Sequence, residues 1–227
     1  MSVAAFLANL DPAAPVRTLR GGPATAEAFF DLCRRQPDTP WKLAVHRDPD
    51  TGAAICHFVD QVSHARIFID LDAGRVDKLV HAHAIHGILQ REAGWLRALD
   101  GSGRTPRLLD QGPDRLGMTY LGEPLRQHNL PADWRDQAQA ILAALDRAGC
   151  CHNDIKCDNL VVRDGRLGLI DFGFSTRRRA PIPAEWPEPL GRQHRLAVHR
   201  FDDRHAIHAA CAQAAAGRVD LSRRVAG

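Results

Sequence analysis

The chain has 227 residues, with 25% charged side chains, 44% hydrophobic side chains and a formal net charge of +3. These values are typical of a globular protein, and so small and dispersed a positive charge argues against a nucleic-acid partner. No apolar run approaches the roughly 18 residues that a membrane-spanning helix requires. We therefore predict no nucleic-acid partner and no membrane span, which leaves only peripheral contact with a membrane.

Two features of the composition indicate the cellular location of the protein and its candidate functional residues. The six cysteines have no disulfide-like spacing and the first ten residues carry no basic leader, which favours a reducing, cytoplasmic setting. Only three of the 30 basic residues are lysines, namely Lys42, Lys78 and Lys156. Glutamate is scarce in the same way, and Glu92 is one of few. Because lysine and arginine are not interchangeable, each lysine is a candidate for a specific role.

The first part of the chain is predicted to be an N-terminal extension, residues 1–40, followed by a mainly β lobe, residues 41–121. A helical pattern covers 25–35 in the extension. A second helical pattern in the lobe covers 83–99. Short apolar runs between turn residues predict strands at 42–46, 55–62, 66–71, 75–80, 108–109 and 116–121.

The remainder, residues 122–227, is predicted to be mainly helical. An amphipathic helix at 131–147 stops at Gly149. A polar loop at 150–159 then leads into a hairpin with strands at 160–162 and 167–170. An exposed loop at 174–200 precedes a last helix at 202–216. The predicted fold class is α+β with two lobes.

The most informative stretch is His152-Asn153-Asp154-Ile155-Lys156-Cys157-Asp158-Asn159, followed after the hairpin by Asp171-Phe172-Gly173. This order, His-x-Asp-x-Lys-x-x-Asn, then a hairpin, then Asp-Phe-Gly, resembles the catalytic loop and metal-binding triplet of the protein-kinase-like superfamily. Each half alone is weak evidence, whereas both halves in this order and spacing are specific. The resemblance covers roughly residues 41–216 and implies a two-lobed, protein-kinase-like fold with a shortened C-lobe.

The resemblance also implies roles for the residues of these motifs. Asp154 would be the catalytic base, which accepts the proton of the attacking hydroxyl. Lys156 would steady the γ-phosphate of ATP. Asn159 and Asp171 would hold Mg²⁺, or Mn²⁺ in its place, through oxygen atoms.

Upstream, the resemblance implies a nucleotide site in the β lobe. Kinase-like proteins use a strand lysine, paired with a helix glutamate, to bind the α- and β-phosphates. Lys78 and Glu92 fit these positions, and the scarcity of both residue types supports the assignment. The stretch around Thr119, Tyr120 and Leu121 resembles the hinge that receives adenine through its backbone, and only its position in the chain supports that prediction.

Several departures from the superfamily pattern limit the resemblance. No glycine-rich loop precedes Lys78, and the candidate phosphate-covering turn is either 62–64 or 50–52. Asn153 replaces the arginine that often receives a phosphate on the activation loop, which argues against a phosphorylation switch. Either Asp202 or Asp203 resembles the aspartate that opens the central helix of the C-lobe.

These observations predict an ATP- and Mg²⁺-dependent phosphotransferase, a small bacterial-type Ser/Thr protein kinase with a protein or anionic hydroxyl-bearing acceptor. Arg177, Arg178 and Arg179 favour an acidic or phosphorylated acceptor. Aminoglycoside-type phosphotransferases share most of the motifs but usually lack the lysine found at Lys156. Two alternatives stay open: a kinase acting on lipopolysaccharide-core sugars or other small molecules, and a pseudokinase that only binds.

Overall fold

The computed structural model describes residues 16–18, 31, 41–52, 54–60, 65–80, 87–180 and 202–218. The chain divides into two compact units, Met1–Ala84 with Leu109–Tyr120, and Ile85–Leu108 with Leu121–Gly227. The predicted helix at 25–35 lies outside the described residues except for Asp31, which is helical. The sequence-based division into 1–40, 41–121 and 122–227 stays a prediction.

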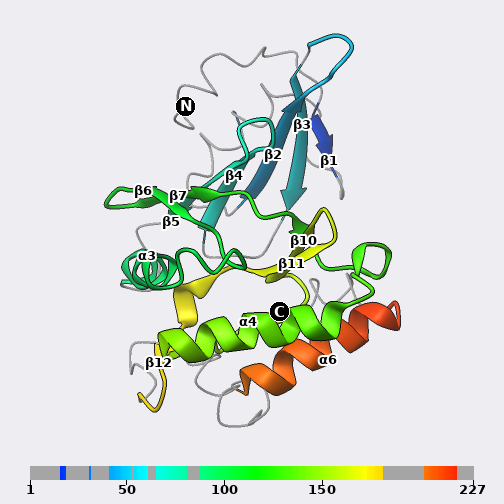
Figure 1. Cartoon of the computed structure of the whole chain (residues 1–227). Helices are drawn as coiled ribbons and strands as arrows, with labels where there is room; N and C mark the ends of the chain where they lie inside the picture. Colours follow the sequence, from blue (N-terminus) through cyan, green and yellow to red (C-terminus); the bar gives the residue numbers. More distant parts are fainter. Residues whose placement is uncertain are drawn as a thin grey trace. The chain divides into compact units, whose positions relative to one another are not determined.

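The first unit contains a seven-stranded mixed sheet, in the order β1-β3-β2-β4-β5-β7-β6 (Figure 1). Its strands are β1 (Val16–Thr18), β2 (Trp41–Arg47), β3 (Ala54–Asp60), β4 (Ala65–Asp70), β5 (Arg75–Val80), β6 (Leu108–Gln111) and β7 (Arg115–Thr119). Strand β2 pairs antiparallel with β3 and parallel with β4, so it separates two strands that are neighbours in sequence. The predicted strands are confirmed within the described residues, with β7 ending at Thr119 rather than at residue 121. Residues 61 and 62 of the predicted strand 55–62 lie outside them.

Strand β5 presents different chemistry on its two faces. Lys78 lies opposite Ile67 of β4 and Leu116 of β7, on the same face as the apolar Val76. Asp77 lies on the other face and is fully buried. Its carboxylate accepts hydrogen bonds from Arg75 at 2.7 and 2.9 Å and from Arg115 at 3.1 Å. Because these guanidinium groups satisfy the buried charge, Asp77 fixes the register around Lys78.

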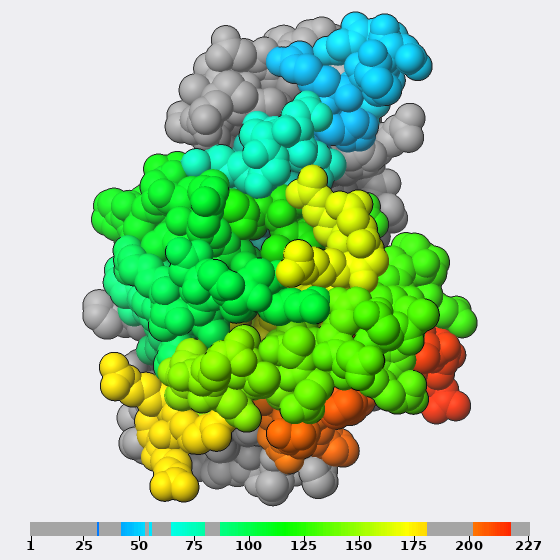
Figure 2. All heavy atoms as spheres, viewed as in Figure 1, coloured from blue at the N-terminus to red at the C-terminus, as the bar shows by residue number. Residues whose placement is uncertain are grey.

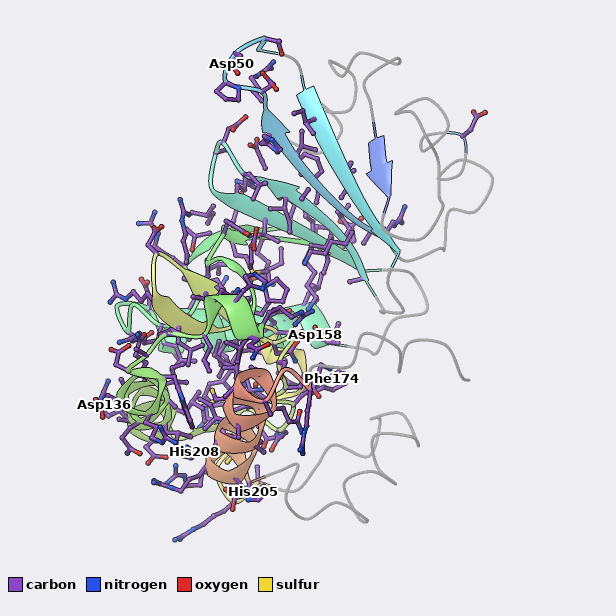
Figure 3. The ribbon with its side chains drawn as sticks, turned by 90° about the vertical axis from the view of Figure 1, so that its right-hand side faces the viewer. Asp50, Asp136, Asp158, Phe174, His205 and His208 are labelled. Carbon is purple, nitrogen blue, oxygen red and sulfur yellow. The ribbon has the colours of Figure 1, made fainter. Side chains whose placement is uncertain are left out.

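The turn at residues 48–52 joins β2 to β3 and lies at the opposite end of this sheet from Lys78. The carboxylate of Asp48 accepts the amides of Asp50 and Thr51, and Gly52 has a φ of 68°. Figure 3 shows Asp50 at the tip of this hairpin. Lys42, at the other end of β2, lies opposite Ile67 of β4, which in turn lies opposite Lys78. This turn is therefore not the phosphate-covering turn, and the alternative at 62–64 lies outside the described residues.

The second unit contains the helices α3 (Ile88–Ala98), α4 (Trp134–Ala148) and α6 (Asp203–Ala215) (Figure 1). Its short 3-10 turns are η1 (Gln127–Asn129) and η2 (Phe172–Phe174). Strands β8 (Glu123–Pro124), β10 (Leu160–Arg163) and β11 (Arg166–Leu169) form one small sheet, and β9 (Cys150–Cys151) pairs with β12 (Thr176–Arg177). None of the described helices is long and apolar enough to cross a membrane.

Helix α4 follows its predicted range, 131–147, but begins three residues later, at Trp134. Its apolar stripe, which includes Ile141 and Leu145, is buried, and Gly149 ends the helix with a φ of 64°. Helix α4 lies beside α6 (Figure 1), and its opposite side faces the viewer in Figure 2. Removing one such side chain, as in Ile141→Ala, costs about 2–5 kcal/mol in a packed core.

Three sequence-based boundaries in the second unit need correction. Helix α3 begins at Ile88, not at residue 83, and the residue before it, Gly87, has a left-handed φ of 75°. The polar loop at 150–159 begins with strand β9, which pairs with β12. The predicted exposed loop at 174–200 starts with buried residues, Phe174 and Ser175, before the exposed run 177–180. Residues 181–200 lie outside the described part of the chain.

Candidate active site

His152 anchors the loop between β9 and β10 that carries the catalytic-loop motif. Its side chain is fully buried, and the ring of Phe172 lies edge-on to it with the centroids 4.8 Å apart. Nε2 lies 3.0 Å from the carbonyl oxygen of Ile170, and Nδ1 accepts the amide of Asp154 at 3.3 Å. Because a carbonyl only accepts, the ring proton lies on Nε2. The histidine therefore ties the loop to the end of β11.

Asp203 holds the same loop from helix α6. Its carboxylate accepts the backbone amides of His152 at 2.7 Å and Asn153 at 3.0 Å. Burial raises the pKa of Asp203, and the two amides oppose that shift. The neighbouring Asp202 instead caps α6 by accepting the amide of His205 at 3.1 Å. The sequence did not distinguish which of these two aspartates opens the central helix. In the structure they have different hydrogen-bond partners.

Three of the predicted site residues meet at one carboxylate, that of Asp154. Oδ2 of Asp154 lies 2.8 Å from Nζ of Lys156 and 3.0 Å from Nδ2 of Asn159. Asn159 also donates to the backbone oxygen of Asp154 at 2.8 Å. The Asp154 side chain is 9% exposed and that of Lys156 46%. Both of these side-chain donors, among the described residues, lie on Oδ2 of Asp154 rather than on Oδ1.

The hairpin of β10 and β11 brings Asp171 to this loop. Asn159 precedes β10 and Asp171 follows β11, and the amide of Ile170 donates to the carbonyl of Asn159 at 2.9 Å. Asp171 is half-buried and has a left-handed φ of 67°. Both hydrogen bonds of the Asn159 side-chain amide to described residues use its nitrogen rather than Oδ1. An amide oxygen and a carboxylate are hard donors that fit a magnesium ion.

The lysine predicted to bind the phosphates and the glutamate predicted to pair with it belong to different units. Lys78 is on β5 of the first unit and is 8% exposed. Glu92 is on α3 of the second unit and is 1% exposed. A buried lysine and a buried glutamate each require a partner. Their mutual ion pair stays a prediction.

The predicted adenine-binding stretch spans the point where the two units join along the chain. Thr119 ends β7, and the amide of Tyr120 donates to the carbonyl of Gly74 at 2.7 Å. Leu121 packs against Gly168 of β11, where a larger residue would collide with it. The backbone amide of Tyr120 is thus engaged within the first unit, and the binding of adenine by this stretch stays a prediction.

Two side chains of α3 that no sequence motif indicated contact the Asp-Phe-Gly segment and the residues after it. Arg91 donates to the carbonyl oxygen of Gly173 at 2.8 Å, and the Trp95 indole donates to that of Ser175 at 3.3 Å. Their spacing of four residues places both on one face of α3. That spacing was the available signal, but it does not reveal the partner segment.

The described cysteines near the loop form no disulfide. Cys150, Cys151, Cys157 and Cys211 are free, and Cys157 donates to the carbonyl of Ala210 at 3.2 Å. Both ring nitrogens of His152 are engaged as described above. Across the described ranges, no group of three or more His, Cys, Asp or Glu side chains is arranged to hold a metal ion. Burial raises the pKa of the Cys150 thiol and raises that of Cys211 to about 12.

One protein family matches the chain over residues 3–178, and its description is the phosphotransferase enzyme family (APH). No curated protein sequence gives a significant match. The match covers both the sheet of the first unit and the loop that carries Asp154 and Asp171. The α+β fold is thus kinase-like, and the activity is phosphoryl transfer. The chain belongs to the APH phosphotransferase enzyme family, within the protein-kinase-like superfamily.

Proposed function

We propose that the chain transfers the γ-phosphoryl group of ATP to a hydroxyl group, with Asp154 as the catalytic base. The hydroxyl oxygen attacks the γ-phosphorus, the bond to the β-phosphate oxygen breaks, and ADP leaves. The proton of the hydroxyl passes to Oδ1 of Asp154. The observation that carries the proposal is the convergence of Lys156 and Asn159 on Oδ2, which orients the carboxylate and leaves Oδ1 for the substrate.

Lys156 and Asn159 have separate tasks in this proposal. The ammonium group of Lys156 is half-exposed, so it can contact a transferring phosphate while it remains beside Asp154. The amide nitrogen of Asn159 holds Asp154, and its oxygen would hold a magnesium ion together with Asp171. Such an ion, or manganese in its place, neutralises charge on the phosphates. Lys78, oriented by Glu92, would bind the α- and β-phosphates, and Thr119, Tyr120 and Leu121 would border the adenine.

The acceptor that we propose is a serine or threonine hydroxyl of a protein. Lys156 supports this choice because aminoglycoside-type members usually lack a lysine there. The exposed Arg177 and Arg179 favour an acidic or phosphorylated acceptor. Arg178 differs from them, because its guanidinium pairs with Asp146 of α4.

A lipopolysaccharide-core sugar or another small molecule is the second candidate acceptor. The matched family is defined by phosphoryl transfer in general and not by protein substrates, which favours this alternative. Labelled ATP with Mg²⁺ or Mn²⁺, offered with protein acceptors and separately with lipid-linked sugars, distinguishes the two. Transfer to protein alone supports the first candidate, and transfer to sugar alone replaces it with the second.

Equilibrium binding of ATP with and without Mg²⁺ tests the site itself. We expect Mg²⁺ to strengthen binding and Asp171→Asn to remove most of that gain. Asp154→Asn keeps the size of the side chain, so it should retain nucleotide binding but lose phosphoryl transfer. Equal ATP affinity with and without metal in the wild type, together with no transfer to any acceptor, would instead identify a pseudokinase.

A further inference from the structure

Three consecutive backbone carbonyl groups follow Asp171. Each accepts a hydrogen bond from a side chain elsewhere in the chain. The carbonyls of Gly173 and Ser175 accept hydrogen bonds from Arg91 and Trp95 of α3. The carbonyl of Phe174, between them, accepts a hydrogen bond from the Asn153 amide at 2.9 Å. The residues of this segment, labelled at Phe174 in Figure 3, are buried from Phe172 to Ser175.

Asn153 joins three segments through one residue. Its backbone amide donates to Asp203, and its side-chain nitrogen donates both to Phe174 and to Oγ1 of Thr176, the latter at 3.0 Å. The residue is 5% exposed, so water does not compete for these bonds. Its φ of 66° is uncommon for a residue other than glycine, which indicates that the surroundings impose this conformation.

These contacts limit the conformations open to Asp171. Asp171 has the left-handed conformation described above and is followed directly by η2. A change in the backbone conformation of Asp171 would shift the peptide groups of residues 173–175, which follow it directly. Such a movement would break bonds to Arg91, Trp95 and Asn153 together, and each bond contributes a factor of about 2 to 10 to the population of the observed state.

We propose that Asn153, with Arg91 and Trp95, is a positioning residue that holds Asp171 at its metal-binding position with no phosphate on the segment. The inference rests on the proposed function, in which Asp171 binds the metal ion. The neutral Asn153 amide contacts the segment directly through Phe174 and Thr176.

Four variants isolate these contacts. Asn153→Gly keeps the left-handed backbone and removes both side-chain hydrogen bonds, whereas Asn153→Ala adds strain at the same φ. Thr176→Val removes one acceptor at constant shape. Trp95→Phe removes the indole donor together with part of the ring. Arg97→Met, at an exposed position of α3, is the control.

The readouts are Mn²⁺ affinity by electron paramagnetic resonance with a non-hydrolysable ATP analogue, and hydrogen exchange of residues 172–178. In Asn153→Gly we expect Mn²⁺ affinity to fall about tenfold and exchange of the segment to rise by a similar factor. Trp95→Phe and Thr176→Val should each show a smaller change in the same direction. ATP affinity without metal should not change, because the segment would act on the metal alone.

The outcomes separate this inference from the proposed function. Wild-type Mn²⁺ affinity in Asn153→Gly, with only a lower melting temperature, would mean that the residue is merely structural and would overturn the inference. Metal-independent nucleotide binding in the wild type would overturn the proposed function instead, even if segment exchange still rises in the variant. Phosphatase-treated protein should bind Mn²⁺ and transfer phosphate as well as untreated protein. A loss after phosphatase treatment would also contradict the inference.

Discussion

The carboxylate of Asp203 accepts hydrogen bonds from the backbone amides of both His152 and Asn153, at 2.7 and 3.0 Å. Asp203 lies at the start of α6, about fifty positions further along the chain, yet it determines how the catalytic loop is held. Asp154 follows directly in that loop. The position of the proposed base therefore depends on the docking of α6 as well as on the residues around Asp154.

Asp203→Asn should weaken both stability and transfer. The amide replaces one accepting oxygen with a donor that faces a backbone N–H, so we expect a loss of about 2–3 kcal/mol in the free energy of unfolding. Urea denaturation measures the loss. The control is Asp202→Asn, because asparagine caps helices as well as aspartate does and should change stability by less than about 0.5 kcal/mol. Similar losses in both variants would show that the loop contact is unimportant.

Lys78→Met should reduce phosphoryl transfer by at least about 100-fold, because a strand lysine that binds the phosphates contributes mainly to the transition state. Methionine has a similar length but leaves the buried Glu92 without its predicted partner, so the melting temperature should fall as well. Steady-state transfer and thermal denaturation check both expectations. Lys42→Met is the comparison, because Lys42 lies in the same cross-strand row. Full activity of Lys78→Met and a loss in Lys42→Met would mean that Lys42 is the phosphate-binding lysine.

Neutralising Arg177 and Arg179 together, as glutamines, should raise KM for an acidic acceptor about fivefold and leave kcat within about twofold. The reason is that exposed charges bind the ground and transition states alike. Arg178→Gln is the internal comparison, because its partner Asp146 engages it. Initial rates at varied acceptor concentration provide the measurement. Efficient turnover of a short basic peptide, unchanged in the double variant, would show that Arg177 and Arg179 do not bind the acceptor.

The buried thiols should resist alkylation in the folded protein. Burial raises the pKa of Cys211 to about 12, so at pH 8 only about one molecule in 10⁴ carries its thiolate. Cys151 is half-buried and should react before Cys150, Cys157 and Cys211. Iodoacetamide labelling followed by peptide mass mapping gives the order, with guanidinium-unfolded protein as the fully reactive control. Early labelling of Cys211 would contradict its burial.

The buried thiol of Cys211 should also lower the stability of the protein at alkaline pH. The folded-state pKa of Cys211 is raised above its unfolded value, so the folded state retains the proton longer and stability falls as pH rises from about 9 to about 12. Unfolding free energies measured across that range should decline less steeply in Cys211→Ala than in the wild type. Equal slopes would show that Cys211 does not titrate as its burial implies.

The sequence by itself determined those parts of the protein that depend on residues close together in the chain. Strand β5 and helix α4 followed from hydrophobic periodicity, and the glycine stop at Gly149 followed from its freedom at positive φ. The grouping of Asp154, Lys156 and Asn159 followed from a spacing of five residues or fewer. Local spacing carries such information because one loop or one helix turn brings these atoms together.

Only the tertiary structure decided which distant residues meet. It assigned Asp203 rather than Asp202 to the loop, inserted β2 between β3 and β4, and placed Arg91 against Gly173, 82 positions away. No periodicity encodes these contacts, since each depends on how separate elements pack. The conformation of Asp171 is determined in this way, because the hydrogen bonds around it come from α3 and from the loop at Asn153.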